Sequence, residues 1–264
     1  MPAVRRHSTE FRRGVNIFFA ANPTLSAQNF AHEMGAINGP VNFRSDFGVR
    51  GDMETNLKNT GYGVGIIHYF NFAYRASCSC FTELTYFNDH FKLRSELSHF
   101  MGNLRHYGMW VERSSVNAGY LREMRGEFSV TNFGMQLEYF PMSIREFGAR
   151  GYSIAPYFAF GAHYSMFSPE VTSTLGKVGL PTTTHPKYMG DAINNSGGNT
   201  FSIINAVGAR YKIAPLSDLI FELRWQYYLS DWVDGMNPNP DIYKENIAND
   251  WILWLNFGYV YTFL

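Results

Sequence analysis

The segment LIFELRWQYYL, residues 219–229, alternates between large apolar and polar side chains. Leucine or an aromatic residue stands at every odd-numbered position, whereas Glu222, Arg224 and Gln226 stand between them. Successive side chains of a β-strand point to opposite faces, so this segment predicts a strand with one apolar and one charged face. The end of the chain, WILWLNFGYVYTF at 251–263, places Trp251, Leu253, Leu255, Phe257, Tyr259, Tyr261 and Phe263 on one face.

The same period of two recurs along the chain and predicts eight strands. They cover residues 33–41, 62–74, 91–100, 128–140, 153–167, 201–212, 219–229 and 251–263. Most of these strands are as long as the roughly 9 to 11 residues that a tilted strand needs to cross a bilayer, or slightly longer. In the second strand, Gly61, Gly63 and Gly65 lie opposite Tyr62 and Val64. Small residues on one face suit the interior of a narrow barrel.

The composition agrees with a membrane barrel. Of the 264 residues, 17% are aromatic and 17% are charged, against about 25% charged in an ordinary soluble domain. Lys plus Arg and Asp plus Glu number 22 each, so no global positive field favours nucleic acid. No apolar run approaches the roughly 20 residues of a membrane-spanning helix. If the chain crosses a bilayer it must do so with strands, and then only a closed barrel leaves no edge unpaired.

Two kinds of barrel share this periodicity. A soluble lipocalin-like barrel would turn its apolar face inward, whereas an outer-membrane barrel turns it outward. Eight rows of bulky rings are too many for an eight-stranded interior, so we predict an all-β, eight-stranded antiparallel up-and-down transmembrane β-barrel. The aromatic residues expected to face lipid are Trp225, Tyr227, Trp251, Phe257, Tyr259, Tyr261 and Phe263. The polar residues expected to pair within the lumen are Lys92, Arg94, Glu96, Gln136, Glu138, Arg210, Glu222, Arg224 and Gln226.

Connection lengths predict an orientation. With the amino end in the periplasm, the long connections 42–61, 101–127, 168–199 and 231–250 lie outside the cell, and the shorter ones 75–90, 141–152 and 213–218 are periplasmic turns. The turn 75–90 is large for its kind and contains Cys78 and Cys80. This C-x-C pair is poorly spaced for a mutual disulfide and lacks the further ligands of a zinc site. We treat it as a candidate partner-docking feature, an insertion without a partner being the alternative.

The first 28 residues have the order of parts of an export signal. Arg5, Arg6, Arg12 and Arg13 precede a short apolar stretch at 15–21, and residues 25–28 offer a cleavage end. A secretory signal has this arrangement. We therefore expect residues 1–28 to be an export segment and residues 29–264 to be a single barrel domain.

Several segments resemble known exported proteins. HEMGAINGPVNFRSDFG from His32, NTGYGVGIIHYFNFAY from Asn59 and YFNDHFKLRSELS from Tyr86 are similar to a group of uncharacterised exported barrels of the Bacteroidota. SIAPYFAFGAHYSMFSPE from Ser153 and ARYKIAPLSDLIFELRWQYYLSDWVDG from Ala209 resemble the PorG-type outer-membrane proteins of that phylum.

The PorG resemblance implies an eight-stranded barrel in the outer membrane of a Gram-negative bacterium, associated with the type IX secretion and gliding apparatus. Its implied partners are outer-membrane lipid and the subunits of a periplasmic ring. The large turn 75–90, with its two cysteines, departs from that pattern. The shared segments mark strands and turns, so they indicate fold better than function.

Catalytic motifs are absent from the sequence: it has no G-x-S-x-G, no H-E-x-x-H and no P-loop. His99 with Ser95 and Ser98 offers a base and a nucleophile, but a polar strand end explains these residues more simply. His68 and His163 are read as lumen or interface residues. Oxygen-bearing side chains at Asp231, Asp234, Asn237, Asn239 and Asp241 suit calcium, but their spacing is not that of an EF-hand and favours a solvated loop.

We therefore expect no enzyme, no cofactor and no metal, but a barrel that anchors or organises an envelope assembly such as the type IX machinery. The alternatives are an outer-membrane lipid-modifying enzyme and a soluble lipocalin-like binder of small molecules. An eight-stranded barrel is filled by its own side chains, so a porin role is disfavoured.

Overall fold

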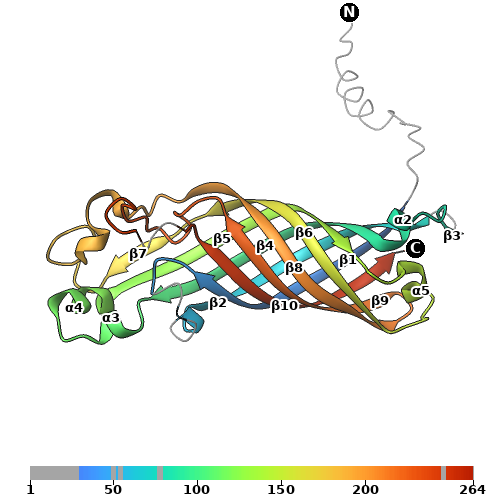
Figure 1. The fold of residues 1–264 in the computed structure, drawn as a ribbon, viewed down its shortest axis with the longest axis horizontal. Coiled ribbons are helices and arrows are strands. Elements are labelled where there is room, and N and C mark those ends of the chain that lie inside the picture. Colours follow the sequence, from blue (N-terminus) through green and yellow to red (C-terminus); the bar gives the residue numbers. More distant parts are fainter. Residues whose placement is uncertain (1–29, 49–51, 53–55, 76–79, 245–247, 264) are drawn as a thin grey trace, which may run out of the picture.

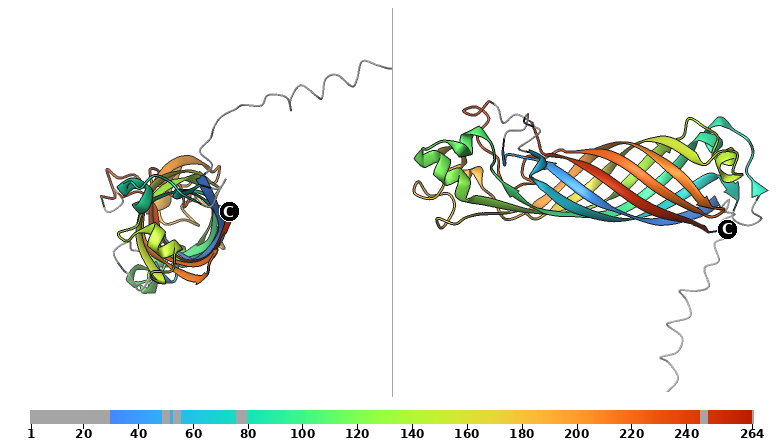
Figure 2. Two further views of the ribbon diagram at one scale, coloured as in Figure 1. Left: turned by 90° about the vertical axis from the view of Figure 1, so that its right-hand side faces the viewer. Right: turned by 90° about the horizontal axis from the view of Figure 1, so that it is seen from below.

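The chain forms a closed, eight-stranded antiparallel barrel, which confirms the predicted fold class (Figures 1 and 2). The computed structural model describes residues 30–48, 52, 56–75, 80–244 and 248–263, so the predicted export segment lies outside the described residues. The barrel strands are β1 (Phe30–Arg44), β2 (Thr60–Arg75), β4 (Phe91–Arg105), β5 (Met124–Tyr139), β6 (Ile154–Phe167), β8 (Gly198–Ala214), β9 (Ser217–Tyr228) and β10 (Trp251–Phe263). Each pairs with its neighbour in the chain, and β10 pairs with β1 to close the ring.

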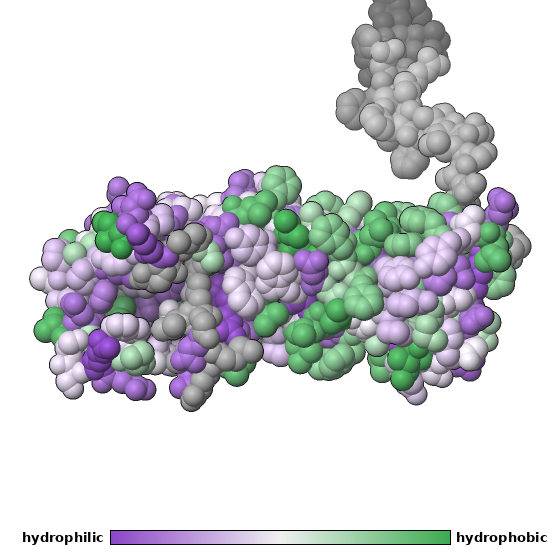
Figure 3. Space-filling view, in the orientation of Figure 1, coloured by the Kyte–Doolittle hydropathy of each residue, from purple (hydrophilic) through white to green (hydrophobic). Residues whose placement is uncertain are grey.

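Closure fixes which side chains meet in the lumen. The first and last strands are in register over much of their length, from His32 opposite Phe263 to Arg44 opposite Trp251. Because the alternation continues around the ring, the charged faces of the strands point to the same interior. Large apolar side chains cover the outer wall, where Phe160 is 63% exposed and Phe133 is 58% exposed. Figure 3 shows these hydrophobic residues gathered over the barrel wall, and hydrophilic residues gathered at its left end.

The long and short connections lie at opposite ends of the barrel (Figure 1). The loop end carries α3 (Met109–Glu112), α4 (Val116–Glu123), β7 (Glu170–Ser173) and the 3-10 helices η1 (Pro186–Tyr188) and η2 (Gly190–Ala192). The turn end carries β3 (Cys80–Phe81), α2 (Tyr86–His90) and α5 (Ile144–Gly148), together with the start of β1 and the end of β10. None of the helices in the described part of the chain is long and apolar enough to cross a membrane.

Strands continue into several of the predicted loops, and they do so furthest in 101–127 and 168–199. The sequence predicts residues 101–127 as a connection, yet β4 and β5 stay paired up to Arg105 opposite Arg125. Over these extra residues the polarity of the two faces is reversed: Leu104 and Met124 are buried inside, while Arg105 and Arg125 are exposed outside. Because the outer face of this extension is polar, a strand pattern that requires apolar residues on the outer face does not predict it. Residues 170–173, also predicted as loop, form β7 on the free edge of β5.

The large turn between β2 and β4 is folded against its neighbour. The Thr85 side chain caps α2 by accepting from the backbone N–H of Asn88 at 3.1 Å. The buried Asp89 carboxylate accepts from the hydroxyl of Ser143 at 2.9 Å and from the backbone N–H of Arg145 at 3.1 Å. The backbone of Cys80 pairs with Arg75 at the edge of β2, and Cys78 lies outside the described residues.

Candidate functional site

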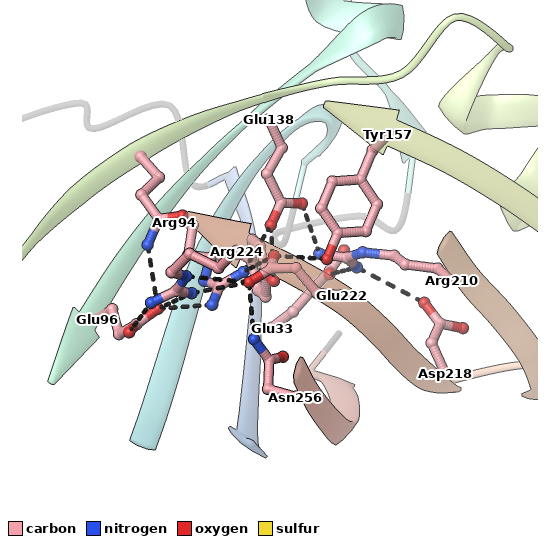
Figure 4. A network of polar contacts seen from close by, with 12 residues as sticks. Glu33, Arg94, Glu96, Glu138, Tyr157, Arg210, Asp218, Glu222, Arg224 and Asn256 are labelled. Carbon is pink, nitrogen blue, oxygen red and sulfur yellow. Dashed lines mark hydrogen bonds and ion pairs between the residues drawn. The ribbon is translucent and has the colours of Figure 1, made fainter. Parts of the chain in front are cut away.

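Within the described residues, the barrel interior holds a network of five acids and five bases, none with a side chain more than 7% exposed. The acids are Glu33, Glu96, Glu138, Asp218 and Glu222, and the bases are Lys92, Arg94, Arg210, Lys212 and Arg224. Figure 4 shows most of this lumen network. The equal numbers matter because a buried charge without a counter-charge is very costly in a medium of low polarity.

Arg224 and Arg94 hold the half of the network nearer the loop end. The two outer nitrogens of the Arg224 guanidinium contact the two oxygens of Glu96 at 2.6 and 2.8 Å, a bidentate pair. Arg94 contacts Glu96 at 2.5 Å and Glu222 at 2.7 Å. Arg224 also contacts Glu222 at 2.9 Å. Each carboxylate therefore bridges two guanidinium groups.

Arg210 holds the half nearer the turn end. It contacts Glu33 at 2.6 Å, Glu138 at 3.3 Å and Asp218 at 3.7 Å. Lys92 contacts the other oxygen of Glu33 at 2.5 Å. Glu138 also contacts Arg94 at 3.2 Å, which joins the two halves into one network.

Neutral side chains satisfy further acceptors of the network. The hydroxyl of Tyr157 donates to Glu222 at 2.7 Å, and that of Tyr69 donates to Glu138 at 2.9 Å. The amide of Asn256 donates to Glu222 at 2.9 Å. The Arg210 guanidinium lies 4.1 Å from the centre of the Tyr69 ring, a cation–π contact that adds to the ion pairs.

Above this network, toward the loop end, the lumen is filled by rings. Phe43 stacks on Phe128 with centroids 4.6 Å apart, and Phe100 meets the edge of Trp254 at 4.8 Å. The Arg224 guanidinium lies 4.7 Å from the Trp254 ring and links the charged layer to the apolar one. The filled interior leaves little room for an aqueous channel.

The structure places all nine polar residues predicted for the lumen inside it, each buried to 3% exposure or less. It also brings in Glu33, Asp218 and Lys212, which are not among the residues predicted from the sequence. Asp218 falls in the predicted turn 213–218, and Glu33 begins a predicted strand of small residues. Glu33 lies four residues before the inward-facing Ile37, and Asp218 lies four residues before the inward-facing Glu222. An even spacing along a strand places two side chains on the same face, and this spacing is the sequence feature from which their inward position could have been predicted.

The seven predicted aromatic residues all lie on the outer face. Trp225, Phe257, Tyr259, Tyr261 and Phe263 are between 37% and 49% exposed. Tyr227 and Trp251 lie opposite one another near the loop end and are half-buried. The buried Arg44 guanidinium lies 5.6 Å from the Trp251 ring.

The histidine candidates do not form a catalytic pair with a serine. His99 and Ser98 point to opposite faces of β4, and the His99 Nδ1 atom lies 3.0 Å from the Thr131 hydroxyl instead. His163 is buried in the lumen, where its Nε2 atom lies 3.2 Å from the Gln136 amide nitrogen. His68 is on the outer wall, its Nε2 atom 2.9 Å from Nδ1 of His32.

The oxygen-rich loop after β9 uses its side chains for its own folding. The buried Asp234 carboxylate accepts from the backbone N–H groups of Met236 at 2.7 Å and Asp46 at 2.8 Å. Burial and the nearby Asp46 carboxylate raise the pKa of Asp234 well above its usual range. The Asn239 side chain accepts from the backbone N–H of Asp241 at 2.9 Å. Among the described residues, no group of three or more His, Cys, Asp or Glu side chains is arranged to hold a metal ion.

Comparison with known proteins gives matches of structure alone. No protein-family model matches the chain, and no curated protein sequence matches it. The structure is similar to the attachment invasion locus protein Ail of Yersinia pestis (9% identity, 89% of this chain and 99% of that chain, TM-score 0.42). It is also similar to a major outer membrane protein of Thermus thermophilus (14% identity, 88% and 100%, TM-score 0.45) and to the outer membrane protein OprG of Pseudomonas aeruginosa (10% identity, 88% and 97%, TM-score 0.41).

Removing one member of the lumen network is expected to destabilise the barrel strongly. Arg224→Met leaves Glu96 and Glu222 short of a counter-charge, so the free energy of unfolding should fall by roughly 3 to 5 kcal/mol. Adding Glu96→Leu removes one of the stranded carboxylates and should recover part of this loss. Guanidinium unfolding of both variants in detergent micelles measures the difference, and equal stability of Arg224→Met and the wild-type chain would contradict the network's role.

His106, just beyond β4, should make stability depend on pH. Burial, with His185 and Lys187 nearby, lowers its pKa from 6.5 to about 3. The unfolded chain then takes up the proton first, so the stabilising effect is complete above pH 6.5 and is lost as the pH falls toward 3. The expected gradient is at most about 1.4 kcal/mol per pH unit.

The measurement is the free energy of unfolding of the wild-type chain minus that of His106→Leu, followed from about pH 7 to about pH 4, the range in which an ordinary histidine gains its proton. The raised pKa of Asp234 acts in the opposite direction, and taking the difference between the two proteins cancels it. Parallel curves for the two proteins would show that His106 is not the group responsible.

Proposed function

We propose that this chain is an integral outer-membrane β-barrel that serves as a non-enzymatic anchor or organiser in the cell envelope of a Gram-negative bacterium. The observation that carries the proposal is the sidedness of the wall. Leucine and aromatic side chains cover the outside, while the charged groups of the lumen network are paired inside. Outer-membrane barrels alternate in this way, apolar toward lipid and polar toward the lumen.

The arrangement argues against the two alternative functions. A lipocalin-like barrel keeps an apolar interior for its ligand, whereas here the interior is occupied by Arg94, Arg210, Arg224 and their carboxylates. A lipid-modifying enzyme needs a base within reach of its nucleophile. Of the two serines considered with His99, Ser98 points to the opposite face of β4 and Ser95 lies four residues away along the strand.

The turn end supports a role in an assembly. Beside β3 and α2, four large apolar side chains are exposed, which we call the turn-end platform: Phe81 (49%), Leu84 (72%), Tyr86 (64%) and Phe87 (47%). Arg145 lies 5.0 Å from the Phe81 ring and ties the platform to the neighbouring turn. An exposed apolar patch of this kind typically binds protein or sits at the membrane surface.

The partners that we propose for this platform are periplasmic ring subunits of a type IX secretion apparatus. The sequence resemblance to PorG-type proteins and the orientation expected from connection lengths support this proposal, since short connections face the periplasm in such barrels. The region that contains Cys78 and Cys80 adjoins the platform in the chain.

The membrane position is tested with two single-tryptophan variants, one keeping Trp225 and the other Trp254, reconstituted in vesicles of lipid brominated along the acyl chains. Trp225 is 37% exposed on the wall and should be quenched strongly, whereas Trp254 is fully buried inside and should be quenched weakly. Similar quenching of the two residues, or failure of the barrel to enter vesicles, would contradict the proposal.

The assembly role is tested with Leu84→Glu, which places a charge on the turn-end platform, and with Val116→Glu as a matched control. The two side chains are 72% and 71% exposed, at opposite ends of the barrel. Leu84→Glu should reduce co-purification of ring subunits several-fold and impair secretion, and Val116→Glu should change neither. Intact secretion in a strain that lacks the barrel would refute the secretion role.

A further inference from the structure

The outer wall contains a groove of about 530 Å³ that lies across β6, β8 and β9 and reaches Phe91 of β4, Leu137 of β5 and Leu253 of β10. Its lining is apolar, with Phe158 and Phe160 on one side and Leu223 and Trp225 on the other. The floor is β8, where Asn205 and Val207 carry short side chains between these rings. The groove thus lies within the surface that we assign to the lipid.

Asn205 is the polar exception in this groove. It is exposed on the outer face of β8, opposite Phe160 on one neighbouring strand and Trp225 on the other. Along β8 itself the outward neighbours toward the loop end are Ile203 and Phe201, and toward the turn end Val207. Apolar residues therefore surround the amide in all four directions along the wall.

Several other outward polar side chains of the wall have partners. The Tyr62 hydroxyl donates to the side-chain oxygen of Asn38 at 2.6 Å. His99 pairs with Thr131, and His32 pairs with His68. Asn205 makes no side-chain hydrogen bond within the part of the chain that the structure describes.

An unbonded amide facing hydrocarbon is costly, of the order of a few kcal/mol. An acyl chain fills a groove but offers nothing to an amide at this depth, so lipid would leave Asn205 unsatisfied. A second protein surface that brings a donor and an acceptor to this point removes the cost. Polar residues within membrane-spanning segments usually have such a functional reason.

We propose that the groove is the contact surface between two copies of this chain in the membrane, with the Asn205 amides of the two copies hydrogen-bonded to each other. A primary amide has both an acceptor oxygen and donor hydrogens, so two related by a two-fold axis satisfy one another. Phe160, which lines the groove and is 63% exposed, gives each copy a large apolar side chain that can pack against the other. The proposal rests on the membrane position argued above.

The test compares the wild-type chain with Asn205→Leu, which keeps the branched heavy-atom shape of the side chain and removes the amide. Both are reconstituted in vesicles, and association is measured by energy transfer between donor- and acceptor-labelled barrels. Asn205→Leu should dimerise roughly tenfold more weakly, the size expected for hydrogen bonds between membrane segments. Asn205→Gln, which keeps an amide, should retain association. Asn38→Leu is the matched control, because its amide already has a partner, and it should dimerise like the wild type.

A second measurement locates the interface. In a background with Cys78→Ser and Cys80→Ser, Asn205→Cys should cross-link to its counterpart with a short bis-maleimide, and Asn38→Cys should not. Wild-type chains that insert into vesicles as monomers, or unchanged association of Asn205→Leu, would overturn the dimer alone. Failure of the wild-type chain to insert would contradict the membrane position itself, and the dimer with it.

Discussion

Charge neutrality in a closed space is the constraint on which the rest of this barrel depends. Strand alternation sends every second side chain inward, and closure of β10 onto β1 leaves those side chains no route to bulk water. Arg94, Arg210 and Arg224 are fully buried, so each must find carboxylates within the ring. Because Glu33, Glu96, Glu138 and Glu222 come from four different strands, the ion pairs join strands that are distant in the chain and so hold the barrel to one register.

The polarity of the two faces differs between the two ends of β4. In the part of β4 nearer the turn end, Lys92, Arg94 and Glu96 point inward and Leu97 outward, whereas near its loop end Leu104 points inward and Arg105 outward. The strand geometry is the same in both parts, and only the polarity of the outward and inward side chains is exchanged. If the barrel lies in a bilayer as proposed, the point at which the polarity reverses marks where hydrocarbon gives way to water on that strand. Beyond it, the apolar rings inside the loop end form the core.

The strand count, the order of the strands and the sidedness follow from local pattern, because a period of two and one charged face are visible in single segments such as 219–229. The extension of the β4–β5 hairpin does not follow from local pattern. Its outer face is polar, so its residues resemble a loop when strands are expected to have apolar outer faces. Local sequence pattern also does not predict which charged side chains form ion pairs with one another in the lumen. Arg94 and Glu222 are 128 residues apart in the chain, and only the closed register brings them to 2.7 Å.

A lumen that pairs its own charges has consequences for where function lies. Arg224 and Glu96 already occupy one another in bidentate fashion, so binding a ligand there would first have to break buried ion pairs. The filled interior is therefore best understood as a structural element that makes the barrel rigid. The groups available for binding another molecule lie on the outer surface instead. They are the exposed apolar side chains of the turn-end platform and the amide of Asn205, which has no side-chain partner among the described residues. A rigid barrel with such groups on its outer surface is suited to holding other molecules in place.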